Sequence, residues 1–154
     1  MGKQEERKMI ATNRRARHEY AIEETCEAGI ALVGTEVKSV RAGRINLQDS
    51  FVRIEGGQAW VYNMSISPYE QGGRFNVEPK RTRKLLLHKQ EINRLIGKYQ
   101  EKGLAIIPLA VYVERGYVKV EIGVGRGRKL YDRRREITER EIERDRRRQL
   151  SERG

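Results

Sequence analysis

The sequence predicts a mainly β fold, an antiparallel barrel of about six strands with two or three inserted helices and a C-terminal tail. Three observations predict this class. Short stretches rich in Val, Ile and Tyr recur at close intervals, and glycine-containing turn signals separate them. The chain has no internal repeat and no alternation of strands with helices, which disfavours a parallel sheet. The final segment, residues 126–154, is too highly charged to belong to the core.

The first part of the chain is expected to be a basic arm followed by two short strands. The arm spans residues 1–19 and places several arginines and His18 directly before the first apolar stretch. Residues 20–26 roughly alternate between apolar and polar side chains, as a half-buried strand does. Glu27–Gly29 then predicts a turn, and residues 30–33 predict a second strand.

Two short helices are expected between the strands. Residues 35–42 fit a helix for which Thr35 would be the N-cap and Gly43 the C-terminal stop. Apolar residues at helical spacing predict a second helix over 88–101, which the chain enters from an extended segment at 84–87.

Two hairpins complete the expected barrel. Residues 50–54 and 58–64 flank a Gly-Gly dipeptide, which predicts a two-residue turn. Residues 104–113 and 117–124 flank a second glycine-containing turn and are rich in Val, Ile and Tyr. Residues 67–80 contain two prolines and two glycines, so we interpret them as a long, mobile loop.

The C-terminal tail, residues 126–154, has a composition unlike that of the predicted barrel. It carries twelve Lys/Arg against seven Asp/Glu, a net +5 out of the chain's +11. Its few apolar side chains do not recur at the spacing of a core-facing stripe, so burial cannot offset its ordering entropy. Glu–Arg pairs four residues apart would support a helix. We therefore expect a tail that is disordered when free and helical when bound to a polyanion.

The positive charge of the whole chain predicts a polyanionic partner. A net charge of +11 and a pI near 10.0 indicate nucleic acid or an anionic membrane. No apolar run approaches the ~18–20 residues of a membrane span, and the N-terminal residues lack the apolar h-region of a signal peptide. The single Cys26 excludes an internal disulfide, so we expect a cytoplasmic protein without membrane contact. Three basic runs, at 13–17, 80–84 and 126–129, favour RNA or DNA binding.

The sequence offers no catalytic constellation, so an enzyme is not expected. Its three aspartates are Asp49, Asp132 and Asp145, and two of them lie in the tail. A two-metal centre needs several carboxylates that converge on the ions, and this distribution does not provide them. His18 and His88 are far apart, and no Cys/His cluster accompanies them, so no metal site is expected. Nucleotide-binding and nucleophile motifs are also lacking. We expect neither catalytic residues nor a cofactor.

Five runs of residues, taken in order, carry a resemblance to a known family. They are N-R-R-A-R-H-E-Y (13–20), E-A-G (27–29), E-V-K-S-V-R-A-G (36–43), R-T-R-K-L-L-L-H (81–88) and Y-D-R-R (131–134). On these runs the sequence resembles the family of small protein B (SmpB), the SsrA- or tmRNA-binding proteins, over nearly the whole chain. The resemblance implies an OB-fold-type barrel within residues 1–125, with its basic N-terminal arm, that binds the tRNA-like domain of tmRNA.

The same resemblance implies a role in bacterial translation quality control. The tail, residues 126–154, would enter the decoding centre and the empty mRNA channel of a stalled ribosome, against small-subunit rRNA. The protein would deliver tmRNA together with elongation factor Tu, so that the nascent chain is tagged and the ribosome rescued by trans-translation. The protein itself would catalyse no reaction.

The resemblance also implies two sets of binding residues. The tmRNA face would comprise Asn13, Glu27, Arg83, Lys84, Leu86, His88, Lys119 and Gly127. The decoding-centre group would comprise Tyr131, Asp132, Arg133 and Arg134, in which Arg133 stands where the family more usually has Lys. Both residues are cations, so a phosphate contact would survive this difference.

Two other function classes remain open at this point. A ribosomal or assembly protein would bind rRNA directly through the same basic surfaces. An RNA-processing enzyme would need the carboxylate or metal constellations that this sequence lacks.

Overall fold

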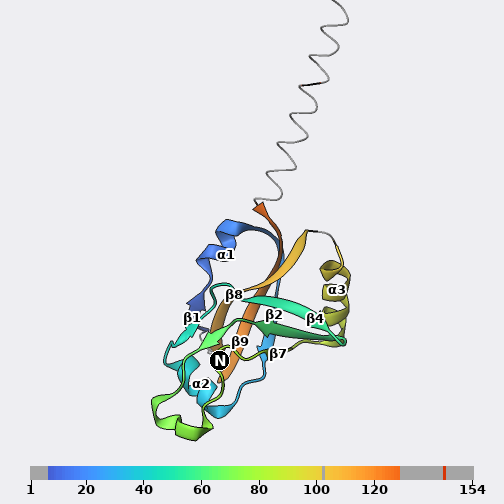
Figure 1. Cartoon of the computed structure of the whole chain (residues 1–154). Coiled ribbons are helices and arrows are strands. Elements are labelled where there is room, and N and C mark those ends of the chain that lie inside the picture. Colours follow the sequence, from blue (N-terminus) through green and yellow to red (C-terminus); the bar gives the residue numbers. More distant parts are fainter. Residues whose placement is uncertain (1–6, 102, 129–143, 145–154) are drawn as a thin grey trace, which may run out of the picture.

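A ring of antiparallel strands forms the centre of the molecule (Figure 1). A computed structural model of the chain describes residues 7–101, 103–128 and 144. Around the ring the strands follow the order β8, β4, β5, β7, β2 and β9, and β9 pairs back onto β8. Their bounds are β2 Tyr20–Ile30, β4 Phe51–Glu55, β5 Gln58–Tyr62, β7 Arg83–Leu86, β8 Leu104–Glu114 and β9 Tyr117–Gly127. A further strand, β1 (Lys8–Thr12), pairs with β8.

Strand β8 closes the ring because it pairs along both of its edges. One edge pairs with β9 along nearly the whole length of the strand. The other edge pairs with β4 at Ile106 and with β1 over Ala110–Val113. An 11-residue strand is long enough to hold both partners end to end. Closure removes the free edges that an open sheet would expose. The structure thus confirms the predicted mainly β, antiparallel barrel.

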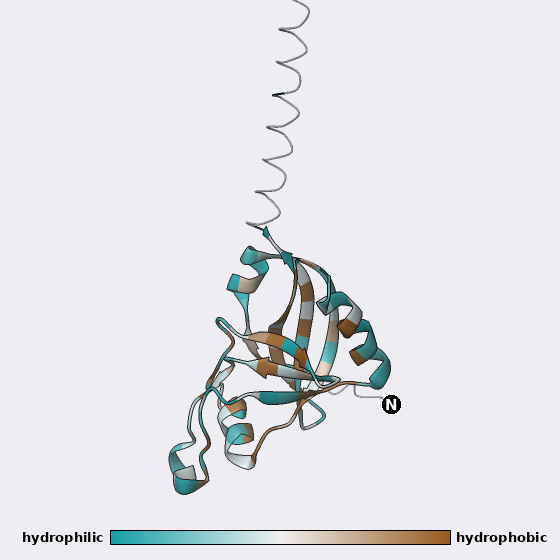
Figure 2. Cartoon of the chain, turned by 45° about the vertical axis from the view of Figure 1, so that its right-hand side comes forward, coloured by the Kyte–Doolittle hydropathy of each residue, from teal (hydrophilic) through white to brown (hydrophobic). Residues whose placement is uncertain are grey.

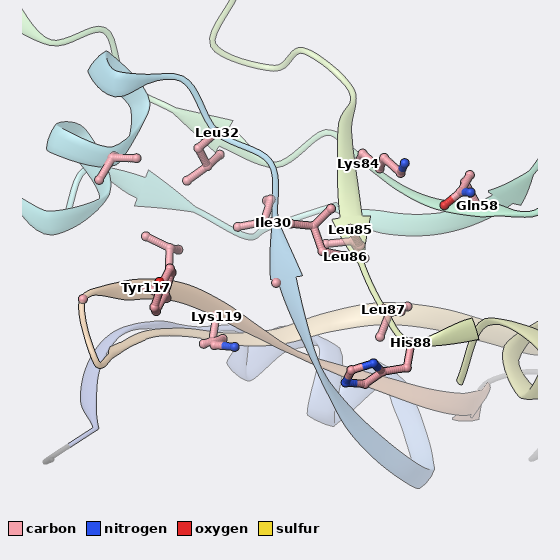
Figure 3. A pocket seen from close by; sticks show the side chains of 14 residues that line it. Ile30, Leu32, Gln58, Lys84, Leu85, Leu86, Leu87, His88, Tyr117 and Lys119 are labelled. Carbon is pink, nitrogen blue, oxygen red and sulfur yellow. The ribbon is translucent and has the colours of Figure 1, made fainter. Parts of the chain in front are cut away.

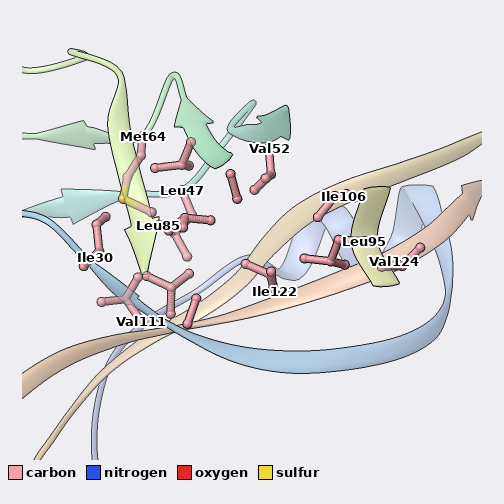
Figure 4. Packing of buried hydrophobic residues seen from close by; sticks show 14 of the residues in the cluster. Ile30, Leu47, Val52, Met64, Leu85, Leu95, Ile106, Val111, Ile122 and Val124 are labelled. Atoms are coloured by element: carbon pink, nitrogen blue, oxygen red, sulfur yellow. The ribbon is translucent and has the colours of Figure 1, made fainter. Parts of the chain in front are cut away.

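Apolar side chains from every strand of the ring fill its interior (Figure 4). They include Ala28 and Ile30 of β2, Val52, Val61, Leu85, Ile106, Val111, Val120, Ile122 and Val124. The helix α3 (Lys89–Tyr99) adds Leu95 to the same cluster. Figure 2 shows hydrophobic residues on the strands and on the side of α3 that faces them. Burial of these side chains is the main stabilising term of the fold.

The N-terminal segment is folded where the sequence predicted a basic arm. Residues 8–12 form β1, and Arg14–Glu19 form the short helix α1. Asn13 caps α1: its side-chain oxygen accepts from the Ala16 N–H at 3.1 Å, and its amide group donates to backbone carbonyls of Leu47 and Pro108. These tertiary contacts give the basic segment a regular conformation for which the sequence offered no prediction.

Strand β2 is continuous where the sequence predicted a turn at Glu27–Gly29. It runs unbroken from Tyr20 to Ile30 and pairs with β9 along this length. Gly29 pairs with Leu86 of β7, and a Cβ at this glycine would lie 3.2 Å from the Leu86 Cβ. The glycine therefore allows two strands to approach closely, and the expected turn was wrong.

The first helix starts slightly earlier than predicted. It is α2 (Gly34–Arg41), and the residue at its N-cap position is Val33 instead of Thr35. The Glu36 carboxylate accepts from the Val33 N–H at 3.0 Å, which satisfies one free donor of the first turn. The Thr35 hydroxyl donates instead to the Phe75 carbonyl at 3.2 Å. Gly43, at φ 77°, ends the helix as predicted.

The strand predicted over residues 30–33 is not formed, because Ile30 is the last residue of β2 and residues 31–33 lead into α2. The predicted hairpins and the second predicted helix agree with the structure, and three further short elements had no prediction. The β4–β5 and β8–β9 hairpins and α3 are confirmed. In the first hairpin Gly56 and Gly57 have φ values of 58° and 73°, as a type I′ turn requires. The unpredicted elements are β3 (Ile45–Asn46), which pairs with β6 (Ser65–Ile66), and the 3-10 segment η1 (Glu70–Phe75).

Candidate nucleic-acid interface

A groove opens where β2, β7 and the β8–β9 turn come together (Figure 3). Its volume is about 540 Å³. Four of the eight residues expected on the tmRNA face line it, and they are Lys84, Leu86, His88 and Lys119. The barrel therefore brings together positions that are up to thirty-five residues apart (84 to 119) in the sequence.

One wall of the groove follows from side-chain alternation along β7. Arg83 and Leu85 point into the protein and are fully buried, so Lys84 and Leu86 point outward. Leu86 leaves 52% of its surface exposed, which is unusual for a large apolar side chain on a strand. His88 follows at the N-cap position of α3 and is also exposed. This wall offers a cation, an apolar surface and an imidazole in a row.

The opposite wall comes from β9. Lys119 lies opposite Gly29 of β2 and opposite Tyr112 of β8 in the strand register. Tyr117 lies at the start of β9, is 70% exposed, and has its ring centroid 6.0 Å from the Lys119 Nζ. Sequence reasoning missed Tyr117 and Gln58, which also line the groove. An aromatic residue between a glycine turn and a lysine was the available signal for Tyr117.

Glu27 lies beside this groove and is held by several donors. Its Oε1 is 3.8 Å from the Lys119 Nζ, and its Oε2 accepts from Arg7 Nη2 at 3.3 Å. The Tyr112 hydroxyl also donates to Oε2. The Glu27 side chain is still 41% exposed, so its carboxylate remains accessible to a ligand.

Two other expected RNA-binding residues lie inside the protein. Asn13 is buried as the cap of α1. Arg83 has 0% exposure, and its guanidinium donates to Glu36 Oε2 at 2.5 Å and to the carbonyls of Met64 and Pro79 at 2.6 and 2.9 Å. Burial lowers the pKa of Arg83, and the Glu36 carboxylate opposes this shift. The polar groups of both side chains are thus engaged within the fold.

Glu36 is the centre of a buried ion-pair network. It is 3% exposed and accepts from Arg81 at 2.5 and 3.2 Å as well as from Arg83. Burial by itself would raise the pKa of Glu36, but the hydrogen bonds from Arg81, Val33 and Arg83 outweigh it, so the pKa lies below its ordinary value. The network ties α2 to β7, the strand that carries Lys84 and Leu86.

Comparison with known proteins identifies the family. The SmpB protein family matches this chain over residues 10–152. The chain belongs to the SmpB protein family. The resemblance seen in the five sequence runs is thereby confirmed.

Several relatives of this SmpB-family chain carry the name SsrA-binding protein. The one from Caldicellulosiruptor bescii is 59% identical over 150 residues, which cover 97% of this chain and 95% of the relative. The one from Desulforamulus reducens is 62% identical over 147 residues, which cover 95% and 91%. A solved structure described as "tmRNA-SmpB: a journey to the center of the bacterial ribosome" is 57% identical. It has a TM-score of 0.65 and covers 76% of this chain and 82% of its own.

Gly127 lies away from the groove, at the last residue of β9. It pairs with Tyr20 and lies eight positions after Lys119, roughly 26 Å along an extended strand. A Cβ at Gly127 would meet nothing within 4 Å, whereas one at Gly125 would lie 2.6 Å from the Ala21 carbonyl oxygen. Packing of β2 against β9 therefore requires glycine at 125 but not at 127.

The remaining expectations concern the decoding-centre group in the tail, metal sites and membrane-spanning helices. The predicted decoding-centre group, Tyr131, Asp132, Arg133 and Arg134, lies outside the described residues. Among residues 7–101, 103–128 and 144, no group of three or more His, Cys, Asp or Glu could hold a metal ion. In that same part of the chain, no helix is both long enough and apolar enough to cross a membrane.

Proposed function

We propose that this chain binds the tRNA-like domain of tmRNA and delivers it to stalled ribosomes for trans-translation. Membership of the SmpB family carries this function, together with relatives named for binding SsrA and a solved tmRNA-SmpB structure on the ribosome. The groove supports it independently, since it gathers two lysines, a histidine and exposed apolar and aromatic side chains in one place. Such a mixture suits RNA, whose phosphates attract cations and whose unpaired bases stack.

Each groove residue has a distinct role in the proposed RNA contact. Lys84 neutralises a phosphate, Lys119 donates to the RNA beside Glu27, and His88 donates to a phosphate or stacks. Leu86 and Tyr117 offer apolar and aromatic surface to an unpaired base. Glu27 accepts from an exocyclic amine at a base edge, which explains a carboxylate on a basic face.

We assign the buried members of the expected set a supporting role. Asn13 fixes α1 against the loop before β4 and the middle of β8, through Leu47 and Pro108. Arg83 fixes β7 from the inside, through Glu36 and two backbone carbonyls. Loss of the Arg83 guanidinium or the Asn13 amide would weaken RNA binding by displacing β7 or α1, without any direct contact between these groups and RNA. Gly127 would mark the end of the barrel, two residues beyond the boundary expected at 125.

In this proposal the tail acts separately from the groove. Residues Tyr131–Arg134 would contact small-subunit rRNA at the decoding centre, and the residues behind them would follow the vacant mRNA channel. Elongation factor Tu would accompany tmRNA in the delivered complex. The protein would work in the cytoplasm, without cofactor or metal, and would catalyse no reaction. Its action is to hold two RNA surfaces in a fixed relation.

A filter-binding comparison tests the RNA partner. At about 0.15 M salt, tmRNA is expected to bind far more tightly than rRNA fragments of equal length. Equal affinity for both would favour a protein that binds rRNA directly. Hydrolysis or modification of either RNA by the purified protein would indicate an enzyme instead.

Truncation after Arg128 tests the separation of groove and tail. The truncated chain retains every groove residue, so its Kd for tmRNA should stay within about threefold of the full chain's. Tagging on stalled ribosomes in a reconstituted translation system should be lost. A large loss of tmRNA affinity would contradict this division of the chain.

A further inference from the structure

We propose that Tyr112 positions Glu27 for RNA recognition, by fixing one carboxylate oxygen so that the other, beside Lys119, can accept from a nucleobase. This inference rests on the proposed function, in which Glu27 belongs to the tmRNA face. Tyr112 lies in β8, outside the three basic runs and the five runs of family resemblance. It does not line the groove, so any effect on RNA must pass through a neighbour.

The contact between the two side chains joins distant parts of the chain. Tyr112 is 1% exposed. Its phenol hydroxyl donates to Oε2 of Glu27, which lies 85 positions earlier in the chain. Burial raises the pKa of Tyr112, and the neighbouring Glu27 carboxylate raises it further, so the phenol stays protonated. A protonated phenol is a permanent donor to the carboxylate.

The strand register explains why the tyrosine reaches the glutamate. Tyr112 lies directly opposite Lys119, and Lys119 lies directly opposite Gly29. Directly opposed residues share a face of the sheet, and so does Glu27, which lies two residues before Gly29. The sheet therefore aligns Tyr112, Lys119 and Glu27 on one face.

Arg7 completes the arrangement on the same oxygen. Its Nη2 lies 3.3 Å from Glu27 Oε2, and its guanidinium carbon lies 4.1 Å from the centroid of the Tyr112 ring. Oε2 thus receives hydrogen bonds from both Tyr112 and Arg7. Oε1 faces the Lys119 Nζ at 3.8 Å, and part of the side chain remains exposed.

This geometry presents an acceptor beside a donor. Oε1 can accept from an exocyclic amine, and the Lys119 ammonium can donate to an adjacent ring or carbonyl acceptor. The Watson–Crick edge of an unpaired base offers that pair of groups. A free glutamate would lose rotamer freedom on binding, whereas one already fixed by Tyr112 loses less. Tyr112 is accordingly a positioning residue for recognition of a base edge.

A double-mutant cycle with Tyr112→Phe and Glu27→Ala tests the proposal. The phenylalanine keeps the ring and removes only the hydroxyl. In the otherwise unchanged protein, Tyr112→Phe should raise the Kd for tmRNA about three- to tenfold. In the Glu27→Ala background, it should change the Kd by less than about twofold, because the carboxylate it positions is gone.

Tyr62→Phe is a matched control. The Tyr62 hydroxyl also donates to a carboxylate, Glu55 Oε1 at 2.8 Å, but Tyr62 lies on β5 and does not line the groove. This variant should leave the Kd for tmRNA unchanged. Thermal unfolding of all variants shows whether either substitution alters the fold.

The outcomes separate this inference from the proposed function. The positioning role is overturned if Tyr112→Phe changes the Kd for tmRNA by the same factor in the unchanged and the Glu27→Ala backgrounds, or if it changes the Kd in neither. A Glu27→Ala variant with unchanged Kd also overturns it, while a loss of binding in Lys84→Ala would leave the proposed function intact. If every groove variant binds tmRNA with unchanged Kd, both the positioning role of Tyr112 and the proposed function are contradicted.

Arg7→Gln provides a second test if Tyr112→Phe does not fold. The Arg7 side chain is about half exposed, at 48%, so its substitution does not disturb the core. It removes the other donor to the same oxygen, and we expect a rise in Kd of about twofold that depends on Glu27. An equal rise in the Glu27→Ala background would show that Arg7 acts as a phosphate contact and would overturn the proposed anchoring of Oε2.

Discussion

Arg83 and Lys84 are neighbours in one basic run, yet they lie on opposite sides of the barrel wall. Arg83 is fully buried and is bound by Glu36 and two backbone carbonyls. Lys84 lines the open groove. Strand alternation alone accounts for this difference. A cluster of basic residues in a sequence therefore does not define a binding surface, because every second residue of a strand points inward.

The two sides of the wall depend on each other. The inner network of Glu36, Arg81 and Arg83 holds β7 against α2, and this fixes the strand from which Lys84 and Leu86 project. Changes on the inner side should therefore act first on stability, and changes on the outer side should act only on RNA binding.

Glu36→Ala should cause the largest loss of stability. It leaves the buried Arg83 guanidinium without its counter-ion, and breaking a buried pair in this way costs about 3–5 kcal/mol. Urea unfolding measures this loss. Glu19→Ala removes an exposed ion pair with Arg15 and is the control, for which no measurable change is expected. Equal effects of the two substitutions would contradict a structural role for the network.

Arg83→Met and Lys84→Met should separate the two sides of the wall directly. The first should lower the free energy of unfolding by about 3 kcal/mol, since it removes one of the two cations paired with the buried Glu36 and leaves the Met64 and Pro79 carbonyls without this donor. The second should leave stability unchanged, weaken tmRNA binding and reduce the slope of log K against log salt by about one. Measurement of both unfolding and salt-dependent binding is needed for each variant. An unchanged slope for Lys84→Met would remove Lys84 from the RNA face.

Acidification should weaken the inner network in a defined direction. The folded-state pKa of Glu36 lies below its ordinary value of 4.5, so the unfolded state binds the proton more readily. The stabilisation by Glu36 is therefore complete above pH 4.5 and is lost as the pH falls through the lower, folded-state value. Urea unfolding from pH 7 downward should show a shallower acid loss for Glu36→Gln than for the unchanged protein. Parallel curves would contradict the depressed pKa.

Leu86→Ser should have the smallest effect and act on binding alone. Leu86 is half exposed, so its loss should change stability little, while the Kd for tmRNA should rise about threefold from lost apolar contact. The salt slope should stay the same because no charge is removed. Filter binding at several salt concentrations measures both quantities. A changed slope would indicate that the substitution disturbs Lys84 or Lys119 as well.

Local sequence patterns predicted those elements whose conformation is set by nearby residues. Gly56-Gly57 specified a tight turn because both residues have positive φ, and the helical spacing of apolar residues specified α3. The prediction failed where a residue serves a distant contact. Gly29 was interpreted as part of a turn, but it permits the close approach of β7 to β2.

The candidate site, like the fold, was predicted only in part. The resemblance to the SmpB family supplied Lys84, Leu86, His88 and Lys119, which the structure brings into one groove. It could not reveal that Asn13 and Arg83 are interior, because burial depends on which face of an element meets the core. Tyr117 was missed because its position between a glycine turn and a lysine suggests an exposed aromatic residue but does not show that the residue faces the groove.

Composition and local patterns were sufficient to establish the class of fold, the charge that favours a polyanionic partner, the principal hairpins and helices, and the family. These follow from residue composition and from conformational preferences that act over a few positions. The folded structure was needed to show that Arg83 is buried while Lys84 lines the groove, and that Tyr112 contacts Glu27, 85 positions earlier in the chain. The physical reason is that strand register and barrel closure, which bring distant residues together, depend on the packing of the whole chain.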